Sequence, residues 1–450
     1  MFSRYLVILI FVFNLVGYGC SHPSSAKLQT PVKFSSIEKI QVKTDTSQSY
    51  SLYLPTGYSS NKSWPVILLF DPHRDGALAV EKFKVAAETF GYILAGSNNA
   101  GNGVENTNQI AENMLDDLSQ RYSIDSKRIY AGGFSGGARI AVAEALNSGK
   151  IKGIIICSAG LGRFDPGYSR SKIDVYGIAG LEDFNYREVI EVPEQLQNSG
   201  WRNAIELFDG SHAWPPQASI FNSVLWHELN AMKDGIIPKD KALLQSWSDS
   251  MKTSVERLIN ENRYLQAERK AESAVSFLKG LSNTSAMEDL LSKIREMPGY
   301  KKEQERDANI RYQESELQKA YSEGFETRDI AWWNNELKAL NEEIENNKDV
   351  LYHQMYSRIK GFLGIAAYSF VSNALGGNDL PRAEKYLAVY QAVEPANADC
   401  FFYKAVLLDR QGKTGEAVTA LRKSLELGFS DKQKIKSSFS AKVLNEAGIQ

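Results

Sequence analysis

Short apolar runs alternate with amphipathic stretches between residues 36 and 235. The apolar runs are continuous rather than alternating, which is typical of strands covered on both faces. They are "YSLYLP", "WPVILLFDP", "GYILAGSN", "KRIYAGGFS", "IKGIIICSAG", "DVYGIAG" and "NAIELFDG". Helical patterns lie between or after them in "ENTNQIAENMLDDLSQRY", "GARIAVAEALNSG", the segment after Asp183 and "ASIFNSVLWHELNAM". This order predicts an α/β domain over residues 36–236, with a doubly wound, mostly parallel sheet.

A second, all-helical region is predicted after "DGIIPKD". From Lys239 onward the chain is rich in helix formers and poor in Pro and Gly, so we expect helices over 237–360 and again over 361–450. Within the last part a 34-residue spacing relates Ala383 to Ala417 and Leu387 to Leu421. That spacing resembles the tetratricopeptide repeat, whose small residues let paired helices approach closely.

A weaker copy of the same internal spacing places Ala267, Ala271 and Ala274 in "YLQAERKAESAVSFL". Two good repeats are fewer than the three usually needed for independent stability, so the intervening helices are expected to stack with them. The alternative is a generic helical bundle. If the resemblance holds, it implies that this region binds a protein partner.

The first twenty residues have the layout of an export signal. Arg4 precedes an apolar run from Tyr5 to Val16, which is shorter than the roughly 20 residues needed to span a bilayer. Gly17 and Gly19 before Cys20 resemble a bacterial lipoprotein cleavage box, although such boxes usually have Leu where Gly17 stands. We therefore expect residues 1–20 to be a lipoprotein signal, Cys20 to carry the lipid, and 21–35 to be a polar tether. The alternative is an ordinary secreted protein cut nearby.

Composition narrows the classes of function. The chain has 450 residues, 43% hydrophobic and 24% charged, which is ordinary for globular domains. Its 52 basic and 54 acidic residues give a formal charge of -2, so there is no cationic excess for a nucleic-acid backbone. Cys157 and Cys400 lie in apolar or helical patterns and are expected to be small buried hydrophobes. No Cys or His has metal-ligand spacing.

The stretch "GGFSGGARIA" carries the strongest chemical signal. Gly133 to Gly137 match the pattern G-x-S-x-G, and a predicted strand precedes Ser135 while a predicted helix follows it. Such a turn exposes the serine hydroxyl at the end of the sheet. The Gly136 N–H and the helix N-terminus would face the negative charge that develops on an attacked carbonyl. The alternative is a serine in a glycine-rich turn.

A serine nucleophile needs a base, and the base needs an orienting acid. Of the five histidines, His212 in "LFDGSHAWPP" follows the last predicted strand and precedes the closing helix. The acid is expected between serine and histidine in chain order. Asp183 in "GLED" is our candidate, Glu182 is the second choice, and Asp209 is a third option better explained as a turn residue.

The loop after an early strand, "LFDPHRDG", is expected to supply a second donor to the oxyanion. Pro72 has no N–H, so the donor would be a neighbour, and His73 is the candidate. Asp71 and His73 are alternatively expected to contact substrate.

Residues 36 to 235 resemble the compact esterases of the α/β-hydrolase superfamily, with polyhydroxybutyrate-depolymerase-like and feruloyl or acetylxylan esterase-like members nearest. "YLPTGY", "WPVILLFDPH", "GGFSGGARIA", "GLED" and "GSHAWP" carry the likeness. It implies acyl transfer to Ser135, proton transfer through His212, orientation by Asp183 and deacylation by water, with no metal or organic cofactor. The short segment between the strands of Cys157 and Val175 leaves no room for a large cap. The expected site is therefore open and suits an ester on a carbohydrate or polymer.

Aromatic side chains near the predicted site offer a place for an acyl or sugar group. Phe134, Phe184, Tyr186 and Trp214 are the candidates, with core packing as the alternative.

Two other interpretations of the whole chain remain. The hydrolase-like part could be a non-catalytic scaffold whose helical repeats bind an envelope partner. It could equally be a serine peptidase, because acyl transfer from an amide uses the same groups. The leading interpretation is an exported serine esterase anchored in the bacterial cell envelope by its lipid.

Overall fold

The computed structural model describes residues 36–162 and 172–449. The predicted signal segment, Cys20 and the tether lie outside the described residues. The chain forms two compact units, the first ending at Gln304 and the second beginning at Glu305. Each unit is described by itself below. No helix of the described ranges is long and apolar enough to cross a bilayer.

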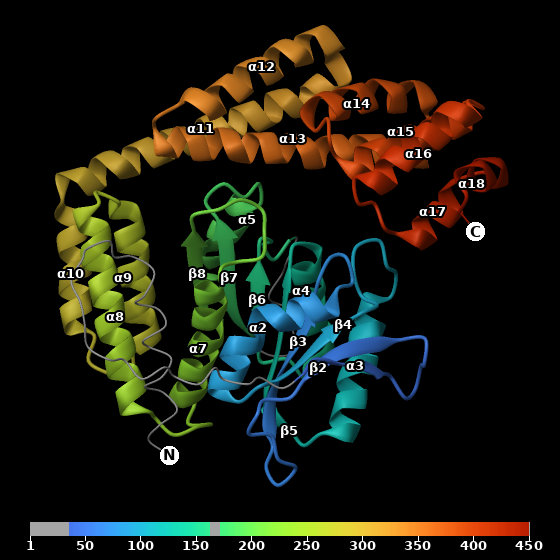
Figure 1. The fold of residues 1–450 in the computed structure, drawn as a ribbon. Coiled ribbons are helices and arrows are strands. Elements are labelled where there is room, and N and C mark those ends of the chain that lie inside the picture. Colours follow the sequence, from blue (N-terminus) through green and yellow to red (C-terminus); the bar gives the residue numbers. More distant parts are fainter. Residues whose placement is uncertain (1–35, 163–171, 450) are drawn as a thin grey trace, which may run out of the picture. The chain divides into compact units, whose positions relative to one another are not determined.

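An eight-stranded sheet forms the centre of the first unit (Figure 1). Its strands are β1 (Glu38–Gln41), β2 (Ser49–Tyr53), β3 (Trp64–Phe70), β4 (Ile93–Ser97), β5 (Ile124–Phe134), β6 (Gly153–Cys157), β7 (Asp174–Gly180) and β8 (Asn203–Phe208). The strand order is β1-β2-β4-β3-β5-β6-β7-β8. β2 runs antiparallel to both β1 and β4, while the remaining neighbours are parallel. The seven predicted strands are confirmed, and β1 is an addition to them.

The helices of the sheet region lie between successive strands, except α7, which follows the last strand. They are α2 (Gly76–Phe90), α3 (Thr107–Arg121), α4 (Gly136–Ser148), α5 (Tyr186–Ile190), α6 (Val192–Leu196) and α7 (Gln217–Lys233). The sequence analysis did not predict α2. Asp75 caps it by accepting a hydrogen bond from the Leu78 N–H, and Gly91 ends it in the left-handed conformation.

Hydrophobic side chains fill both faces of the sheet. One cluster joins β3, β4 and β7 residues to α2 and α7, and the other joins the opposite faces of the strands to α3 and α4. The strands are therefore buried on both sides, which explains their continuous apolar sequences. Cys157 is fully buried at the end of β6, as predicted for a small hydrophobe.

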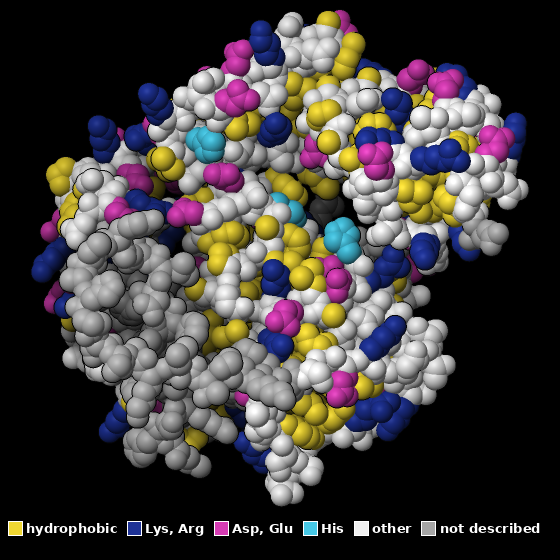
Figure 2. Space-filling model, viewed as in Figure 1, with side chains coloured by type: hydrophobic (Ala, Val, Ile, Leu, Met, Phe, Trp, Pro, Cys, Tyr) yellow, Lys and Arg dark blue, Asp and Glu magenta, His cyan; other side chains and the backbone are white. Residues whose placement is uncertain are grey.

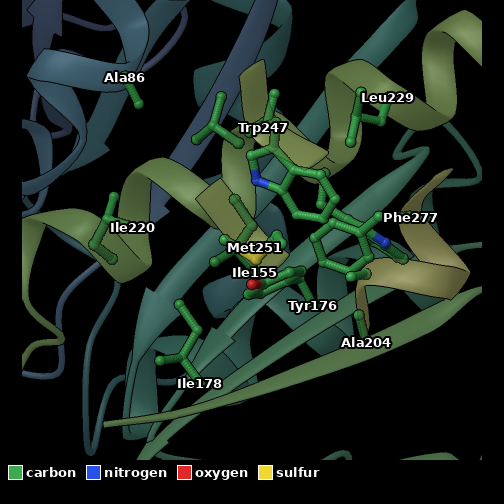
Figure 3. Packing of buried hydrophobic residues seen from close by; sticks show 14 of the residues in the cluster. Ala86, Ile155, Tyr176, Ile178, Ala204, Ile220, Leu229, Trp247, Met251 and Phe277 are labelled. Atoms are coloured by element: carbon green, nitrogen blue, oxygen red, sulfur yellow. The ribbon is translucent and has the colours of Figure 1, made fainter. Parts of the chain in front are cut away.

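Three further helices belong to the first unit: α8 (Lys241–Asn260), α9 (Tyr264–Leu278) and α10 (Ser285–Glu296). Trp247 of α8 stacks on Phe277 of α9, with ring centroids 5.0 Å apart and planes at 6° (Figure 3). Phe277 also lies 6.0 Å from Tyr176 of β7. These rings extend the core of the sheet into the helices, so the change of composition near residue 237 marks new elements rather than a separate core.

The second unit is wholly helical. The boundary between the units falls within α11 (Pro298–Thr327), and the later helices are α12 (Ile330–Asn346), α13 (Val350–Gly376), α14 (Leu380–Val393), α15 (Ala398–Arg410), α16 (Thr414–Glu426), α17 (Lys432–Ser438) and α18 (Ala441–Ala447). Ala383 and Ala417, near the starts of α14 and α16, are fully buried. The helical character predicted for this region is confirmed, and the kinship with tetratricopeptide repeats remains a prediction.

The second unit also contains a buried ion pair. The Arg358 guanidinium donates to both carboxylate oxygens of Glu314, at 2.8 and 2.6 Å, and both side chains are almost completely buried. Elsewhere, on the face of the chain in Figure 2, side chains of both charges are interspersed among apolar ones.

Candidate active site

Ser135 lies in a strained turn between β5 and α4. Its φ of 52° and ψ of −120° place an L-residue in a region that glycine normally occupies. A backbone hydrogen bond fixes the turn to the end of β6: the Ser135 N–H donates to the Cys157 carbonyl at 2.8 Å. This conformation matches the nucleophile elbow that the sequence pattern predicts.

The glycines on either side of Ser135 allow three chain segments to meet. A Cβ on Gly133 would lie 2.6 Å from the Phe70 carbonyl oxygen and 2.5 Å from the Gly137 carbonyl carbon. A Cβ on Gly137 would collide with the same Phe70 oxygen and approach the Asp71 nitrogen to 3.1 Å. Strand β3, strand β5 and helix α4 can therefore be this close only without side chains at these two positions.

The structure brings Ser135, His212 and Asp183 into one hydrogen-bonded chain. His212 Nε2 lies 3.0 Å from Ser135 Oγ, and His212 Nδ1 lies 2.8 Å from Asp183 Oδ1. The three residues come from loops after β5, β8 and β7, which all end at the same edge of the parallel sheet. The geometry fits an imidazole that donates from Nδ1 to the carboxylate and accepts from the serine hydroxyl at Nε2.

Asp183 is the acid that the geometry selects. Its side chain is fully buried, and Oδ1 also accepts the Asn185 N–H at 2.8 Å. Asp209, by contrast, forms an exposed ion pair with Arg263 at 2.9 Å, and no contact joins it to His212. Glu182 lies beside Asp183, but its side chain is not in the chain of hydrogen bonds to His212. Of the three candidates for the acid, Asp183 is thus the one bonded to Nδ1 of His212.

Asn185 is a supporting residue that the sequence analysis did not single out. Its Nδ2 donates to the Ser158 carbonyl at 2.8 Å, while its N–H holds the Asp183 carboxylate. It thereby ties the acid loop to the end of β6. An Asn two residues after a candidate acid is a common turn residue, and nothing in the sequence marks this second contact.

Aromatic rings surround the imidazole of His212. Phe184 stacks on it with centroids 4.0 Å apart, and Phe134 lies 4.8 Å from it on another side. Phe134 also lies 5.4 Å from Trp214. Phe134, Phe184 and Trp214 are all partly exposed, whereas Tyr186 is only 4% exposed and belongs to the core. For Tyr186 the burial favours the alternative of core packing, whereas the other three remain candidates for contact with substrate.

The loop after β3 does not take the role expected of it. The His73 N–H donates to Asp71 Oδ1 at 2.8 Å, and the Arg74 N–H donates to the Asp71 carbonyl at 3.0 Å. Asp71 itself is buried, and its Oδ2 accepts the Trp214 indole N–H at 3.0 Å. Because Asp71 occupies the His73 N–H, the expectation that His73 supplies an oxyanion donor is not supported. Asp71 is likewise a structural anchor rather than a substrate contact.

Gly136 begins α4, where the first N–H groups have no partner within the helix. Among the residues that the structure describes, its N–H has no hydrogen-bond partner, so it is free for an oxyanion. The side chain of Asn102, from the loop after β4, lies directly against Gly136. The sequence analysis missed Asn102, since "NNAGNGVEN" reads only as a turn.

No group of three or more His, Cys, Asp or Glu residues capable of holding a metal occurs within 36–162 and 172–449.

The strand order, the serine turn after β5, the acid after β7 and the histidine after β8 together define an α/β-hydrolase fold. No protein-family model and no curated protein matches the chain.

Several solved structures resemble part of the chain. One is a hyperthermophilic esterase from the archaeon Pyrobaculum calidifontis, at 12% identity and a TM-score of 0.36, with 44% of this chain and 87% of that one covered. Another is the acylaminoacyl peptidase of Pyrococcus horikoshii, at 13% identity and a TM-score of 0.34. The match covers 45% of this chain and only 42% of the peptidase.

A third is a ferulic acid esterase, at 16% identity and a TM-score of 0.35, with 42% of this chain and 95% of that one covered. Because these identities and TM-scores are low, the matches carry no argument. The fold assignment rests on the strand order and the geometry of the serine turn.

Proposed function

We propose that the protein is a serine hydrolase that cleaves carboxylic esters through an acyl-enzyme. The observation that carries this proposal is the continuous chain from Ser135 Oγ through His212 to the buried Asp183. A hydroxyl at its ordinary pKa is a weak nucleophile, and an adjacent base oriented by a carboxylate activates it. The strained turn of Ser135 supports the same function, since strain of this kind is retained where it positions a reacting group.

In the proposed reaction, Ser135 Oγ attacks the ester carbonyl carbon while His212 Nε2 takes the hydroxyl proton. The negative charge on the carbonyl oxygen faces the Gly136 N–H. Collapse of this intermediate breaks the bond to the alcohol, which leaves with the proton from His212. Water then attacks the acyl group with His212 again as base, and Ser135 recovers its proton as the acid product leaves. Asp183 keeps the proton on Nδ1 and stabilises the imidazolium.

Phe134 and Phe184 flank His212 and are proposed to contact the acyl or sugar group of the substrate. His212 retains 20% side-chain exposure, which suits an ester presented on a bulky carrier. A serine peptidase is the second candidate, favoured only by the fact that the same three groups can cleave an amide. Parallel assays with acetyl, feruloyl and hydroxyacyl esters and with aminoacyl amides separate the two.

We further propose, from the sequence, that the protein is exported, anchored through a lipid on Cys20, and bound to an envelope protein through the tetratricopeptide-like helices expected over residues 361–450. Metabolic labelling with an alkyne fatty acid tests the anchor, with Cys20→Ser as the matched variant. Retained label in that variant contradicts the proposed anchor.

Covalent labelling with a fluorophosphonate probe, followed by intact mass, tests the enzymatic proposal. We expect one adduct on the unsubstituted protein and none on Ser135→Ala or His212→Ala. Asp209→Ala is the matched control and should label normally. Asp209 pairs with Arg263 and takes no part in the hydrogen bonds that join Ser135, His212 and Asp183. If the folded, unsubstituted protein takes up no probe, the hydrolase proposal is wrong and the scaffold interpretation replaces it.

A further inference from the structure

The candidate active site has one oxyanion donor fewer than its chemistry calls for. A tetrahedral intermediate is normally stabilised by two donors, and removing one costs about 10²–10³ in kcat. The Gly136 N–H is one such donor. In the loop after β3, Pro72 has no N–H, and the N–H groups of His73 and Arg74 both donate to Asp71. The two N–H groups that follow Pro72 are therefore engaged, so this loop does not supply the second donor from them.

The loop after β4 brings another polar group to this place. The Asn102 N–H donates to the Pro72 carbonyl at 2.9 Å, which fixes the loop on the segment that lacks a free donor. Gly101 makes the approach possible, because a Cβ there would lie 2.8 Å from the Pro72 oxygen and 2.6 Å from Arg74 Cγ. Asn102 is thus held beside the serine turn by backbone contacts that do not use its side chain.

The Asn102 amide occupies the space that a side chain of residue 136 would take. A Cβ built on Gly136 would collide with Asn102 Oδ1, and it would lie 2.8 Å from Cγ and 3.2 Å from Nδ2. Rotation about the Cβ–Cγ bond exchanges the oxygen and nitrogen of an amide, so either end can face this point. Across the described parts of the chain, the amide has no hydrogen-bond partner, and the residue is exposed.

We propose that Asn102 is a catalytic residue whose Nδ2–H group donates to the oxyanion together with the Gly136 N–H. This inference rests on the proposed serine-hydrolase function. An amide NH₂ carries two donors and no charge, so it stabilises the developing negative charge without a counter-ion in the ground state. Two observations then have one explanation. Residue 136 has no side chain, which leaves room for the Asn102 amide, and the N–H groups of His73 and Arg74 are engaged, which leaves the second donor to Asn102.

The test compares Asn102→Ala and Asn102→Asp with the unsubstituted full-length protein, using p-nitrophenyl acetate as the probe ester. We expect kcat to fall about 100-fold or more with KM within about threefold, because the donor acts on the transition state rather than on bound substrate. The affinity for an arylboronate, which forms a tetrahedral adduct on the serine, should fall in parallel. Asn102→Asp should be at least as impaired, since its carboxylate repels the oxyanion.

Asn99→Ala is the matched control in the same loop. Asn99 accepts the Ser49 N–H at 2.8 Å, so its loss loosens the loop without removing the donor at the serine turn. Gly136→Ala is a second variant that keeps Asn102 but displaces its amide with a methyl group, and it should lose kcat similarly.

Two results would overturn the inference while leaving the proposed function intact. One is an Asn102→Ala variant with kcat within threefold of the unsubstituted protein. The other is an Asn99→Ala variant that loses as much activity as Asn102→Ala, because loop integrity would then explain both. Failure of the unsubstituted protein to react with a fluorophosphonate overturns the proposed function and this inference together.

Discussion

The indole nitrogen of Trp214 donates a hydrogen bond to Asp71 Oδ2 at 3.0 Å, across 143 positions of the sequence. The contact joins the loop that carries His212 to the loop after β3. Asp71 uses its other oxygen for the His73 N–H, at 2.8 Å. A single buried carboxylate therefore holds two of the loops that form the candidate site.

Asp71→Ala should remove both anchors. Hydrogen bonds to a charged group contribute about 1.5–3 kcal/mol each, and water can replace part of each bond because His73 and Trp214 are not fully buried, so we expect a loss of about 2–4 kcal/mol of unfolding free energy. Activity should fall about 10- to 100-fold because the His212 loop moves. Calorimetry and ester hydrolysis measure the two effects. Trp214→Phe, which keeps the ring but not the N–H, should show the smaller loss, and equal losses would argue against the bridging role.

Asp183→Asn should lower kcat by about 10⁴ at neutral pH. An amide nitrogen facing His212 would no longer accept from Nδ1, so the imidazole would not be held in the tautomer that accepts the serine proton. Steady-state kinetics on the probe ester measures the loss. Glu182→Gln is the neighbouring control and should stay within about threefold; a comparable loss there would assign the acid to the wrong carboxylate.

Gly137 of the serine turn and Gly132 of strand β5 should differ sharply in their tolerance of a methyl group. Gly137→Ala places a Cβ against the Phe70 carbonyl, so α4 must move away from β3, at a cost of about 1–3 kcal/mol and with loss of the Ser135 geometry. Gly132→Ala places its Cβ 3.3 Å from the nearest atom, the Ile155 oxygen, and needs a much smaller shift. Thermal unfolding and fluorophosphonate labelling of the pair check this ranking.

Stability should depend on pH through Glu144 of α4. Burial raises the pKa of Glu144 to about 7 from its ordinary 4.5, and the nearby Glu112 adds to the rise. The folded state therefore binds more protons than the unfolded state between these two pKa values, and the free energy of unfolding falls as pH rises from about 4.5 to 7. Above that range the loss is complete.

Glu144→Gln should remove this dependence. We expect a midpoint of thermal unfolding about 2–4 °C higher than that of the unsubstituted protein near pH 8, and no difference near pH 4.5. Unfolding scans at the two pH values measure it. A constant difference at both would mean that Glu144 acts through packing and not through its charge.

In the second unit, Arg358→Met should be strongly destabilising because it leaves the Glu314 carboxylate buried without its cation. Breaking a buried pair in this way costs about 3–5 kcal/mol, whereas replacing both partners by apolar residues is often neutral. The double variant Arg358→Met with Glu314→Leu should therefore recover most of the loss. Circular dichroism during heating follows both, and a double variant no more stable than the single one would contradict the expectation.

The sequence predicted the sheet well because strands buried on both faces must be continuous apolar runs. It also placed Ser135, Asp183 and His212 at strand ends in the correct order, and parallel strands bring such ends to one edge. The missed helix α2 carries a helical spacing of buried residues at Ala79, Val80, Phe83, Ala86 and Ala87, so that signal was present.

Other features depend on contacts that no local pattern records. His73 was expected to supply an oxyanion donor, but its N–H donates to the Asp71 side chain instead. The direction of the Asp71 carboxylate depends on the folded loop and cannot be read from the loop sequence. Asn102 was missed for the same reason, since its place against Gly136 is set by a loop after a different strand. The composition near residue 237 indicated new helices, but the stacking of Trp247 on Phe277 that joins them to the sheet is a tertiary contact.

The positive φ of Ser135 lowers the free energy of unfolding of the protein. Glycine adopts such a conformation freely, whereas a residue with a Cβ is held there at a cost of roughly 1–3 kcal/mol. Ser135→Gly should therefore raise the midpoint of thermal unfolding and, under the proposed function, abolish ester hydrolysis. The strain at Ser135 is therefore a local cost to stability, and under the proposed function it is the conformation that presents the hydroxyl to an ester.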